Sequence, residues 1–434
     1  MEGYGHGLFQ FQNPNGSSHT YPHESLEEIF GRLNLNLTRN TRVLGSGLRG
    51  PMQLFHDGFN GGGYPNSTTS RSNHAWPDIN GFLSQNPSST DMLPPSMYNQ
   101  QHVFYPSSSL VELRGQVCAL AKDQNGCRLL QEKLDRGIIT HEEIEMFFME
   151  VKDQLHALMV HRFANYFIQK LFKASNQEIR THLLLLLAGS PQRFLEVCTD
   201  VHGSRTVHKF VDRITTSEQR CILVSLLKPI VVILTNNSNG HHIILQCLYK
   251  FSNKEKRLLA DEIVEHCINI ATNKSGCCVL QQCLINVDAE VQGHLLDQII
   301  ANALLLSEDE FGNYVVQFVL GLKIRGATEA VIAQLEGSFV ALSFNKYGSN
   351  VVEKCLKESG DELSSRIIME IINDPDFVKV IGHDYGNYVA QSALSVSKGD
   401  LRNALLSFIW QNYSFLQSNP FGRRVLSRTR KNHI

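Results

Sequence analysis

The sequence predicts an all-α superhelix built from stacked helical repeats, and three observations support this. From residue 126 onward, a glycine that precedes an apolar pair recurs every 36–39 residues. A helix-capping residue stands three positions before most of these glycines, and aliphatic residues follow at fixed positions after them. Of the 434 residues, 42% are hydrophobic, which is sufficient for a sizeable core.

Nine anchor positions mark the repeat, and positions +1, +2 and so on are counted from them. They are Gly126, Ala164, Gly203, Gly240, Gly276, Gly312, Gly348, Gly386 and Gly422. The successive spacings are 38, 39, 37, 36, 36, 36, 38 and 36 residues. Self-similarity with a period of roughly 20–50 residues is typical of solenoids. Because each repeat buries its apolar face on its neighbours, we expect one stacked array rather than two or three separate domains.

Each repeat is expected to contain helices joined by short turns. Seven of the nine anchors follow a helix-capping residue by three positions: Asp123, Asp200, Asn237, Asn273, Asp309, Asn345 and Asn419. Positions +3, +4 and +8, such as Val315, Val316 and Leu320, share one helical face and should be buried. A second apolar helix follows, for example LLADEIVEHCINIA at residues 258–271.

The N-terminal region, residues 1–95, has a different composition. It is rich in Gly, Asn, Ser and Pro, and no lysine occurs before Lys122. Such a segment buries too little apolar surface to fold, so we expect disorder there. Residues 25–35, SLEEIFGRLNL, combine a capping box with an apolar stripe and favour a short amphipathic helix, either without a role or docking into a partner's groove. We place the repeat domain at residues 96–434.

Several classes of function are disfavoured by the composition. No apolar run approaches the roughly 18 residues of a membrane span, and no signal peptide is evident. The ten cysteines form no C-x-x-C pair, so we expect reduced thiols in a cytoplasmic protein with no metal site and no cofactor. No nucleophile–base pair, carboxylate pair or phosphate loop recurs in a suitable context, so we expect no enzyme. The net charge of −2 argues against binding nucleic acid chiefly through phosphates.

Positions +1, +2 and +5 form a triplet of residues that the core does not need. Positions +1 and +5 lie one helical turn apart and should project together, with +2 beside them. In order, the triplets are Cys127, Arg128, Gln131; Asn165, Tyr166, Gln169; Ser204, Arg205, His208; His241, His242, Leu245; Cys277, Cys278, Gln281; Asn313, Tyr314, Gln317; Ser349, Asn350, Glu353; and Asn387, Tyr388, Gln391. Flat side chains can stack on bases, while amides and carboxylates can hydrogen-bond the Watson–Crick edges of bases. Asn-Tyr-x-x-Gln recurs three times in one register, which a solvated helix face would not show.

These triplets resemble those of the Pumilio/FBF (PUF) family of RNA-binding proteins, over roughly residues 100–434. The resemblance implies a right-handed α-solenoid of eight Pumilio-type helical repeats with flanking half-repeats, in which each repeat binds one RNA base. In that family Asn and Gln around a tyrosine accompany uracil, Ser or Cys with Gln accompanies adenine, and Ser with Glu accompanies guanine. The RNA runs antiparallel to the protein.

Applied to this sequence, the resemblance implies the element 5′-UGUANAUA-3′. The eighth, sixth and second triplets imply uracil, the seventh implies guanine through Glu353, and the first and fifth imply adenine. The third triplet fits adenine less well because His208 replaces glutamine. The fourth fits no base, because Leu245 cannot hydrogen-bond a base edge. Residues 419–424, NPFGRR, resemble the family's C-terminal cap, and the basic tail through Arg428, Arg430 and Lys431 is expected to be a solvated end.

The resemblance further implies a monomer that binds single-stranded mRNA in 3′ untranslated regions and regulates translation and mRNA stability. Deadenylation or translation-repression factors would be its protein partners. An armadillo- or HEAT-like protein–protein scaffold is the alternative, but it predicts no register among the triplets. A divergent PUF-like factor that binds structured RNA without the base code is a second alternative, against which the intact Asn/Gln and Ser/Glu triplets argue.

Overall fold

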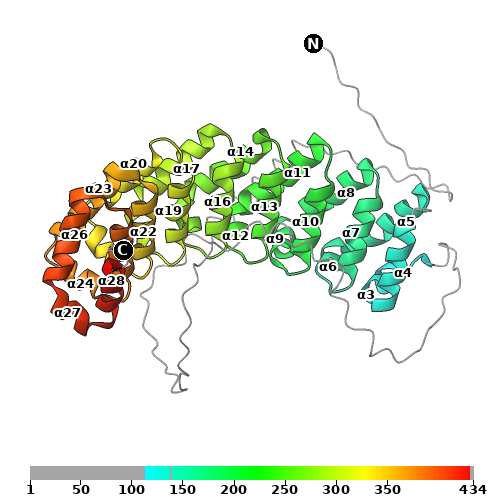
Figure 1. Cartoon of the computed structure of the whole chain (residues 1–434). Helices are drawn as coiled ribbons and strands as arrows, with labels where there is room; N and C mark the ends of the chain where they lie inside the picture. The colour runs from blue at the N-terminus through cyan, green and yellow to red at the C-terminus, as the bar shows by residue number, and fades with distance from the viewer. Residues whose placement is uncertain (1–112, 137–138, 431–434) are drawn as a thin grey trace, which may run out of the picture. The chain divides into compact units, whose positions relative to one another are not determined.

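The computed structural model describes residues 113–136 and 139–430. Within these ranges every regular element is a helix, and all of them belong to one compact unit. The helices stack in sequence order, so that each repeat lies between its two neighbours along the chain (Figure 1). The predicted all-α solenoid is therefore confirmed.

Three kinds of helix alternate along the chain. The short first helices are α3 (Val117–Lys122), α6 (Leu155–Met159), α9 (Pro191–Thr199), α12 (Val231–Thr235), α15 (Cys267–Ala271), α18 (Ala303–Glu308), α21 (Phe339–Phe344), α24 (Phe377–Ile381) and α27 (Tyr413–Ser418). The second helices contain the anchor or start directly after it, and we call them anchor helices: α4 (Gln124–Asp135), α7 (Ala164–Ala174), α10 (Gly203–Arg213), α13 (His241–Lys250), α16 (Gly276–Asn286), α19 (Gly312–Gly321), α22 (Gly348–Glu358), α25 (Gly386–Val396) and α28 (Pro420–Arg430). The third helices are α5 (His141–Val151), α8 (Gln177–Ala188), α11 (Ser217–Leu227), α14 (Asn253–Glu265), α17 (Ala289–Ala301), α20 (Ala327–Leu335), α23 (Gly360–Asn373) and α26 (Gly399–Gln411), with short 3₁₀ turns η3 (Lys152–Gln154) and η4 (Lys228–Ile230).

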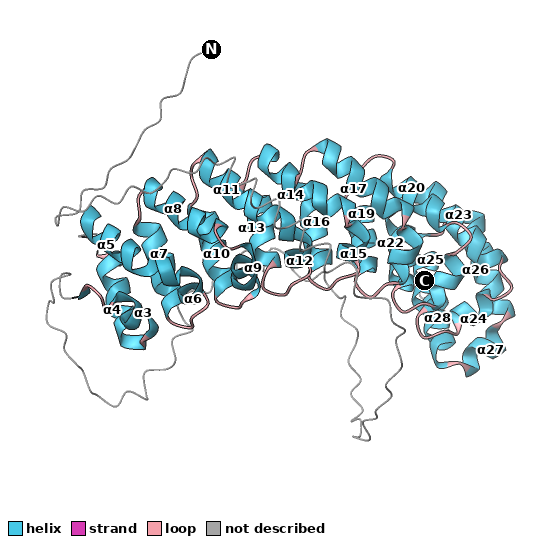
Figure 2. Ribbon diagram, turned by 180° about the vertical axis from the view of Figure 1, so that it is seen from behind, coloured by secondary structure: helices cyan, strands magenta, loops and turns pink. Residues whose placement is uncertain are grey.

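The expectation of one helix over residues 258–271 was wrong. The chain breaks at His266, where φ is −110° and ψ is 22°, and α15 begins at Cys267 as the first helix of the next repeat. The break lets Cys267, Ile270 and Ala271 enter the core in the new helix direction. The apolar pattern continues across this turn, so the break could not be predicted from the order of residues. The third helices and the short helices lie on opposite sides of the anchor helices in both views (Figure 2).

All seven predicted caps are confirmed. Asp309 is typical: its Oδ1 accepts hydrogen bonds from the backbone N–H groups of Phe311 and Gly312, at 2.9 and 2.7 Å. The other six make the same pair of bonds: Asp123, Asp200, Asn237, Asn273, Asn345 and Asn419. Because unpaired N–H groups at a helix start need an acceptor, these side chains fix where each anchor helix begins.

Histidines take the capping place in the two remaining repeats. The Nδ1 of His161 accepts from the N–H groups of Phe163 and Ala164, both at 3.3 Å, and the Nδ1 of His383 accepts from Tyr385 at 3.3 Å. Only an imidazole with an unprotonated Nδ1 can accept these bonds. Burial, together with nearby positive charge, lowers the pKa of His161 and favours that form.

Close backbone contact explains the anchor glycines. A Cβ on Gly203 would lie 2.3 Å from the carbonyl oxygen of Val197, and one on Gly276 would lie 2.3 Å from that of Ile270. The other anchor glycines meet the same position of the preceding short helix, at 2.5–3.2 Å from a backbone atom. Each short helix therefore packs directly against the start of its anchor helix. Beyond this contact, positions +3, +4 and +8 of the first eight repeats are buried as expected, except for the half-buried Leu129, and Val315, Val316 and Leu320 are fully enclosed.

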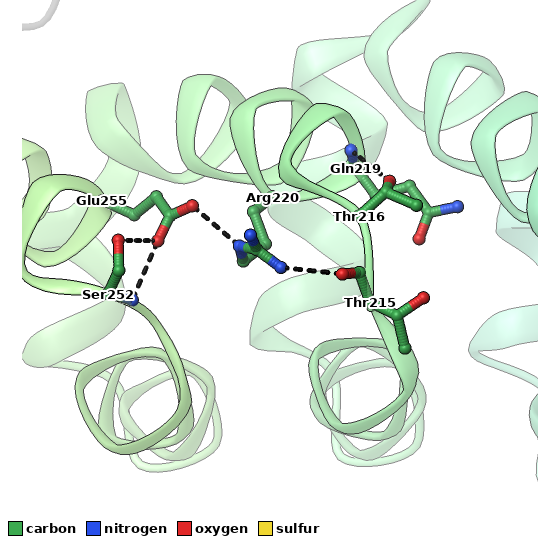
Figure 3. Close-up of polar contacts among 6 residues, drawn as sticks. All are labelled: Thr215, Thr216, Gln219, Arg220, Ser252 and Glu255. Atoms are coloured by element: carbon green, nitrogen blue, oxygen red, sulfur yellow. Dashed lines mark hydrogen bonds and ion pairs between the residues drawn. The ribbon is translucent and has the colours of Figure 1, made fainter.

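Polar contacts between successive third helices supplement the apolar core. At the junction of α11 and α14, the Nε of Arg220 donates to Oε1 of Glu255 at 2.7 Å, while Ser252 donates to Oε2 of the same carboxylate (Figure 3). Arg220 also donates to the carbonyl of Thr215 at 3.0 Å. Burial alone would raise the pKa of Glu255, but the hydrogen bonds from Ser252 and Arg220 outweigh it, so the pKa is lowered.

Some expectations fall outside the described residues. These are the disordered region 1–95, the amphipathic helix at 25–35 and the start of the repeat domain at residue 96. Among the described residues, no helix is long and apolar enough to cross a membrane.

Candidate nucleic-acid interface

The three positions of a triplet differ in how much of the side chain is exposed to solvent. Position +1 is buried in seven of the eight repeats, and the exception is His241, which is half-buried. Position +2 is exposed or half-buried, and Tyr166 and Tyr314 leave 46% and 44% of their surface open. Position +5 lies between these extremes in every repeat except the fifth, where Gln281 is buried. Each anchor helix contacts the next, so the triplets follow one another along a row of adjacent helices.

The three Asn-Tyr-x-x-Gln repeats share one hydrogen-bond pattern. In α19, Nδ2 of Asn313 donates to the carbonyls of Asp309 and Glu310 at 2.8 and 2.9 Å, and its Oδ1 accepts from Nε2 of Gln317 at 2.9 Å. Asn165 and Asn387 each make the same two bonds to backbone carbonyls and accept the same bond from Gln169 and Gln391, at 2.8–3.1 Å. The expectation that +1 and +5 meet is therefore confirmed in these repeats.

This pattern fixes the orientation of the glutamine. Both hydrogens of the asparagine amide are used by the helix, so its oxygen must face the glutamine and accept one N–H. The glutamine keeps one N–H donor and a lone pair of Oε1 for another group, although Oε1 of Gln391 also accepts from Arg428. A donor and an acceptor side by side match the edge of a nucleobase, and the exposed tyrosine beside them offers a flat face for stacking.

The seventh repeat presents a carboxylate instead of an amide. The Oε2 of Glu353 accepts from Nζ of Lys357 at 3.1 Å and from Oγ of Ser392 at 2.9 Å. Both donors contact the same oxygen, Oε2, and neither of these bonds uses Oε1. At position +2, Asn350 donates to the carbonyls of Lys346 and Tyr347 at 3.0 and 3.4 Å, so its amide lies along its own helix.

Cysteines take position +1 in the first and fifth repeats. In α4, Nε2 of Gln131 donates to Sγ of Cys127 at 3.3 Å, and that thiol donates to the carbonyl of Phe163 at 3.1 Å. In α16, a hydrogen bond from Cys277 lowers the pKa of Cys278 to about 7, and the pKa of Cys277 is raised through the same bond and through burial. The small Cys278 side chain occupies the position where three other repeats have tyrosine.

The third and fourth repeats bring three histidines together. The rings of His241 and His242 lie 3.9 Å apart with a tilt of 37°. Burial, with the positive fields of His241, His208 and Arg205, lowers the pKa of His242 to about 4. Burial also lowers the pKa of His241 and of His208, although the charge of Asp212 and a hydrogen bond with Gln246 act in the opposite direction on His208. Two uncharged rings, tilted against each other, therefore occupy the fourth repeat at neutral pH, where the sequence implied no base.

The C-terminal cap contributes residues that the sequence analysis treated as a solvated end. The Nη1 of Arg424 donates to the hydroxyl of Tyr388 at 3.3 Å, and Nε of Arg428 donates to Oε1 of Gln391 at 3.2 Å. Together with Ser427, these four residues line an open pocket beside the eighth triplet. Arg428 is exposed, as a residue of a solvated end would be, and its guanidinium also contacts Gln391. The side chains of Arg430 and Lys431 lie outside the described residues. The sequence contains a signal for this contact, because Arg424 is at position +2 after the ninth anchor, the position that belongs to the triplet in the other repeats.

One group of possible metal ligands lies at the C-terminal end of α14. Glu262, Glu265 and His266 bring three ligand atoms within 4.8 Å of one another. Glu262 already pairs with Lys228 at 3.6 Å, and Nδ1 of His266 contacts the carbonyl of Glu262 at 3.1 Å. Two of the three residues therefore have partners within the protein, and the group does not form part of the triplet row.

Comparison with protein-family models finds one family along this row of repeats. The model is described as the Pumilio-family RNA binding repeat, and it matches eight segments: residues 116–151, 154–188, 193–227, 231–264, 266–300, 302–321, 338–372 and 376–409. Each segment contains an anchor helix and its triplet.

Individual proteins and solved structures agree with this match. Pumilio homolog 12 of Arabidopsis thaliana is 40% identical over 320 residues, which cover 74% of this chain and 53% of that protein. Pumilio homolog 11 of the same plant is 37% identical over 321 residues, covering 74% of this chain and 57% of that protein. The chain thus spans little more than half the length of these relatives. The Puf4 RNA binding domain bound to HO endonuclease RNA 3′ UTR recognition sequence is 34% identical, with a TM-score of 0.64, and covers 71% of this chain and 97% of that one. The RNA-binding domain of yeast Puf5p bound to SMX2 RNA is 26% identical, also with a TM-score of 0.64, over 74% and 98% of the two chains.

Proposed function

The chain belongs to the Pumilio family of RNA-binding repeat proteins, and from this premise we propose that it binds single-stranded RNA in a sequence-specific manner, one base to each triplet. One observation supports this most directly: an identical hydrogen-bonded asparagine–glutamine pair beside a tyrosine in three anchor helices. A surface that bound only protein would have no reason to repeat this amide geometry in register with the fold.

The chemistry of each triplet supports a particular base. In the Asn/Tyr/Gln repeats, the glutamine Oε1 accepts from N3–H of uracil and its remaining N–H donates to a uracil carbonyl, while the tyrosine stacks on the ring. At the seventh repeat, the open oxygen of Glu353 accepts from guanine, whose edge presents the N1–H and N2–H donors. A carboxylate has no donor, so it disfavours the carbonyl-rich edge of uracil.

The proposed element is 5′-UGUANAUA-3′, bound with its 5′ end at the eighth repeat. Gln281 with Cys277, and Gln131 with Cys127, bind adenine, and His208 in the third repeat binds adenine more weakly than a glutamine would. The fourth repeat tolerates all four bases, because neither Leu245 nor the paired histidines offers an amide or carboxylate at the base edge.

We further propose that the RNA lies in 3′ untranslated regions of messages and that binding regulates their translation and stability in the cytoplasm. A similar solved domain is bound to a 3′ UTR recognition sequence, which supports this class of target. Repression would follow from recruiting deadenylation or translation factors to a monomeric protein, through the side of the solenoid away from the RNA or through the N-terminal region.

In vitro selection of RNA by the full chain tests this function. We expect recovered sequences to contain UGUA, followed by an unconstrained base and then an A-rich AUA. Recovery of sequences without a common motif would exclude the base-by-base mode. A single dominant base at the fifth position would show that His241 and His242 contribute to recognition.

A further inference from the structure

A fourth position, +6, lies beside the triplets and contacts the preceding repeat. Ser392 is at +6 of the eighth repeat, and its Oγ donates to Glu353, which is at +5 of the seventh repeat, at 2.9 Å. Arg428 is at +6 of the cap, and its Nε donates to Gln391, at +5 of the eighth repeat, at 3.2 Å. Gln246, at +6 of the fourth repeat, instead donates from Nε2 to Oδ1 of Asp212, at +9 of the third.

The +6 to +5 contact thus occurs at two junctions, once from a hydroxyl to a carboxylate and once from a guanidinium to an amide. Adjacent anchor helices touch, and at these two junctions +6 of one helix meets +5 of the helix before it. At the first junction the longer Lys170 reaches past Gln131 and pairs with Asp135 instead, at 2.7 Å. The side chain at +6 therefore decides whether the base-facing residue of the preceding repeat is supported from the neighbouring helix.

We propose that Ser392 is a positioning residue for guanine specificity, acting through Glu353. Ser392 is only 6% exposed, so its hydroxyl is held in place and is itself shielded from water. It binds Oε2, the oxygen that Lys357 also contacts, and so the carboxylate is held through one oxygen while neither contact uses Oε1. A glutamate without this support rotates about its terminal torsion, which is broad, and loses alignment with the two guanine donors.

This inference rests on the proposed function, since it concerns the base bound at the seventh repeat. It does not require any other base assignment to hold. A merely structural role of Ser392 would weaken binding to every RNA alike, whereas a positioning role alters the preference at one base only.

The test measures affinities of the full chain for four RNAs that differ only at the second base of UGUANAUA: guanine, inosine, adenine and uracil. Inosine lacks the N2 amino group, so the ratio of guanine to inosine affinity reports whether both donors are bound. In Ser392→Ala we expect the preference for guanine over the other bases to fall by about five- to tenfold. Discrimination at the first base, measured with AGUANAUA, should remain unchanged and shows that the variant is folded.

Two further variants serve as controls. Ser395 lies in the same helix, and its hydroxyl donates to the backbone carbonyl of Ser392. The Ser395→Ala variant should therefore keep the full preference for guanine. Ser392→Thr restores the hydroxyl and should recover most of the preference. In a Glu353→Gln background, removing the Ser392 hydroxyl should no longer change which base is preferred, because the carboxylate it orients is gone.

The outcomes separate the inference from its premise. An unmutated chain without any preference for guanine at the second base would overturn the proposed base assignment and the inference with it. A normal preference that Ser392→Ala leaves intact overturns the inference alone. Equal weakening toward all four RNAs also overturns it, because that result identifies Ser392 as a structural residue.

Discussion

At the scale of single residues, the triplets work because +1 is buried and +5 is not. The buried asparagines satisfy their amide hydrogens on backbone carbonyls one turn earlier, which turns their oxygens toward the glutamines. The sequence predicted that +1 and +5 would meet. It did not predict this orientation, because the orientation depends on where the backbone carbonyls lie at the start of each anchor helix.

Exchanging the seventh triplet for the sixth should change the preferred second base from guanine to uracil. In Ser349→Asn/Asn350→Tyr/Glu353→Gln, the amide of the new asparagine would donate to the carbonyls of Asn345 and Lys346. Asn313 donates in the same way to the carbonyls of Asp309 and Glu310. We expect each mismatch to cost about 1–3 kcal/mol, by analogy with DNA sites. Affinities for UGUA and UUUA RNAs measure this, and a persisting preference for guanine would contradict the base assignment.

Cys278 offers a second residue-scale prediction, because it is small at the stacking position. Replacing it by tyrosine gives the fifth repeat the +2 side chain that the second, sixth and eighth repeats already have. Since stacking on an aromatic ring contributes about 1–3 kcal/mol per base, Cys278→Tyr should tighten binding by about fivefold or more. The exposed Cys221 on α11 provides the matched control: Cys221→Tyr should leave the dissociation constant unchanged. Equal effects of both substitutions would refute a stacking role for position +2.

At the scale of helices, the anchor glycines fix how closely each short helix approaches. A methyl group on Gly203 would lie 2.3 Å from a backbone oxygen that cannot rotate away. Gly203→Ala should therefore lower the free energy of unfolding by about 1–3 kcal/mol. Gly293 in α17 has open space around its Cβ position, so Gly293→Ala should stabilise the protein by about 0.5–1 kcal/mol. Urea or thermal unfolding monitored by circular dichroism distinguishes these opposite signs.

The junction between α11 and α14 gives a pH-dependent prediction. The pKa of Glu255 is lowered in the folded protein, so its contribution to stability is present above the unfolded pKa, about 4.3, and is lost as the pH falls through the folded pKa. Glu255→Gln should lower the free energy of unfolding by about 1–3 kcal/mol at pH 7, because it removes the ion pair with Arg220.

Below about pH 4 that difference from the unmutated protein should shrink. Glu290, which pairs with Arg257 on the surface, is the control, and Glu290→Gln should change stability little at any pH. A Glu255→Gln effect that stayed constant down to pH 3 would show that the charge on Glu255 does not contribute.

At the scale of the whole molecule, recognition is expected to depend on the row of triplets rather than on net charge or on the N-terminal region. The net charge of −2 does not attract phosphates in bulk, and the triplets lie between residues 127 and 391. Deleting residues 1–95 should therefore change RNA affinity less than about threefold. Equilibrium binding of the two proteins to UGUANAUA RNA measures this, and a loss of tenfold or more would assign RNA contacts to the deleted segment.

The sequence by itself determined the period of the solenoid, the capping residues, the buried stripe and the eight triplets. These features depend on local periodicity and on hydrogen bonds within one helical turn, which the order of residues specifies directly. Only the tertiary structure decided the break at His266, the histidine caps, the contacts of Arg424 and Arg428 with the eighth triplet, and the support of Glu353 by Ser392. The contacts of Arg424, Arg428 and Ser392 join side chains 36 to 39 positions apart, which meet only when the packed helices are in place. The break and the histidine caps are local, but the apolar pattern runs on across His266 and the caps lack the Asp or Asn of the other repeats.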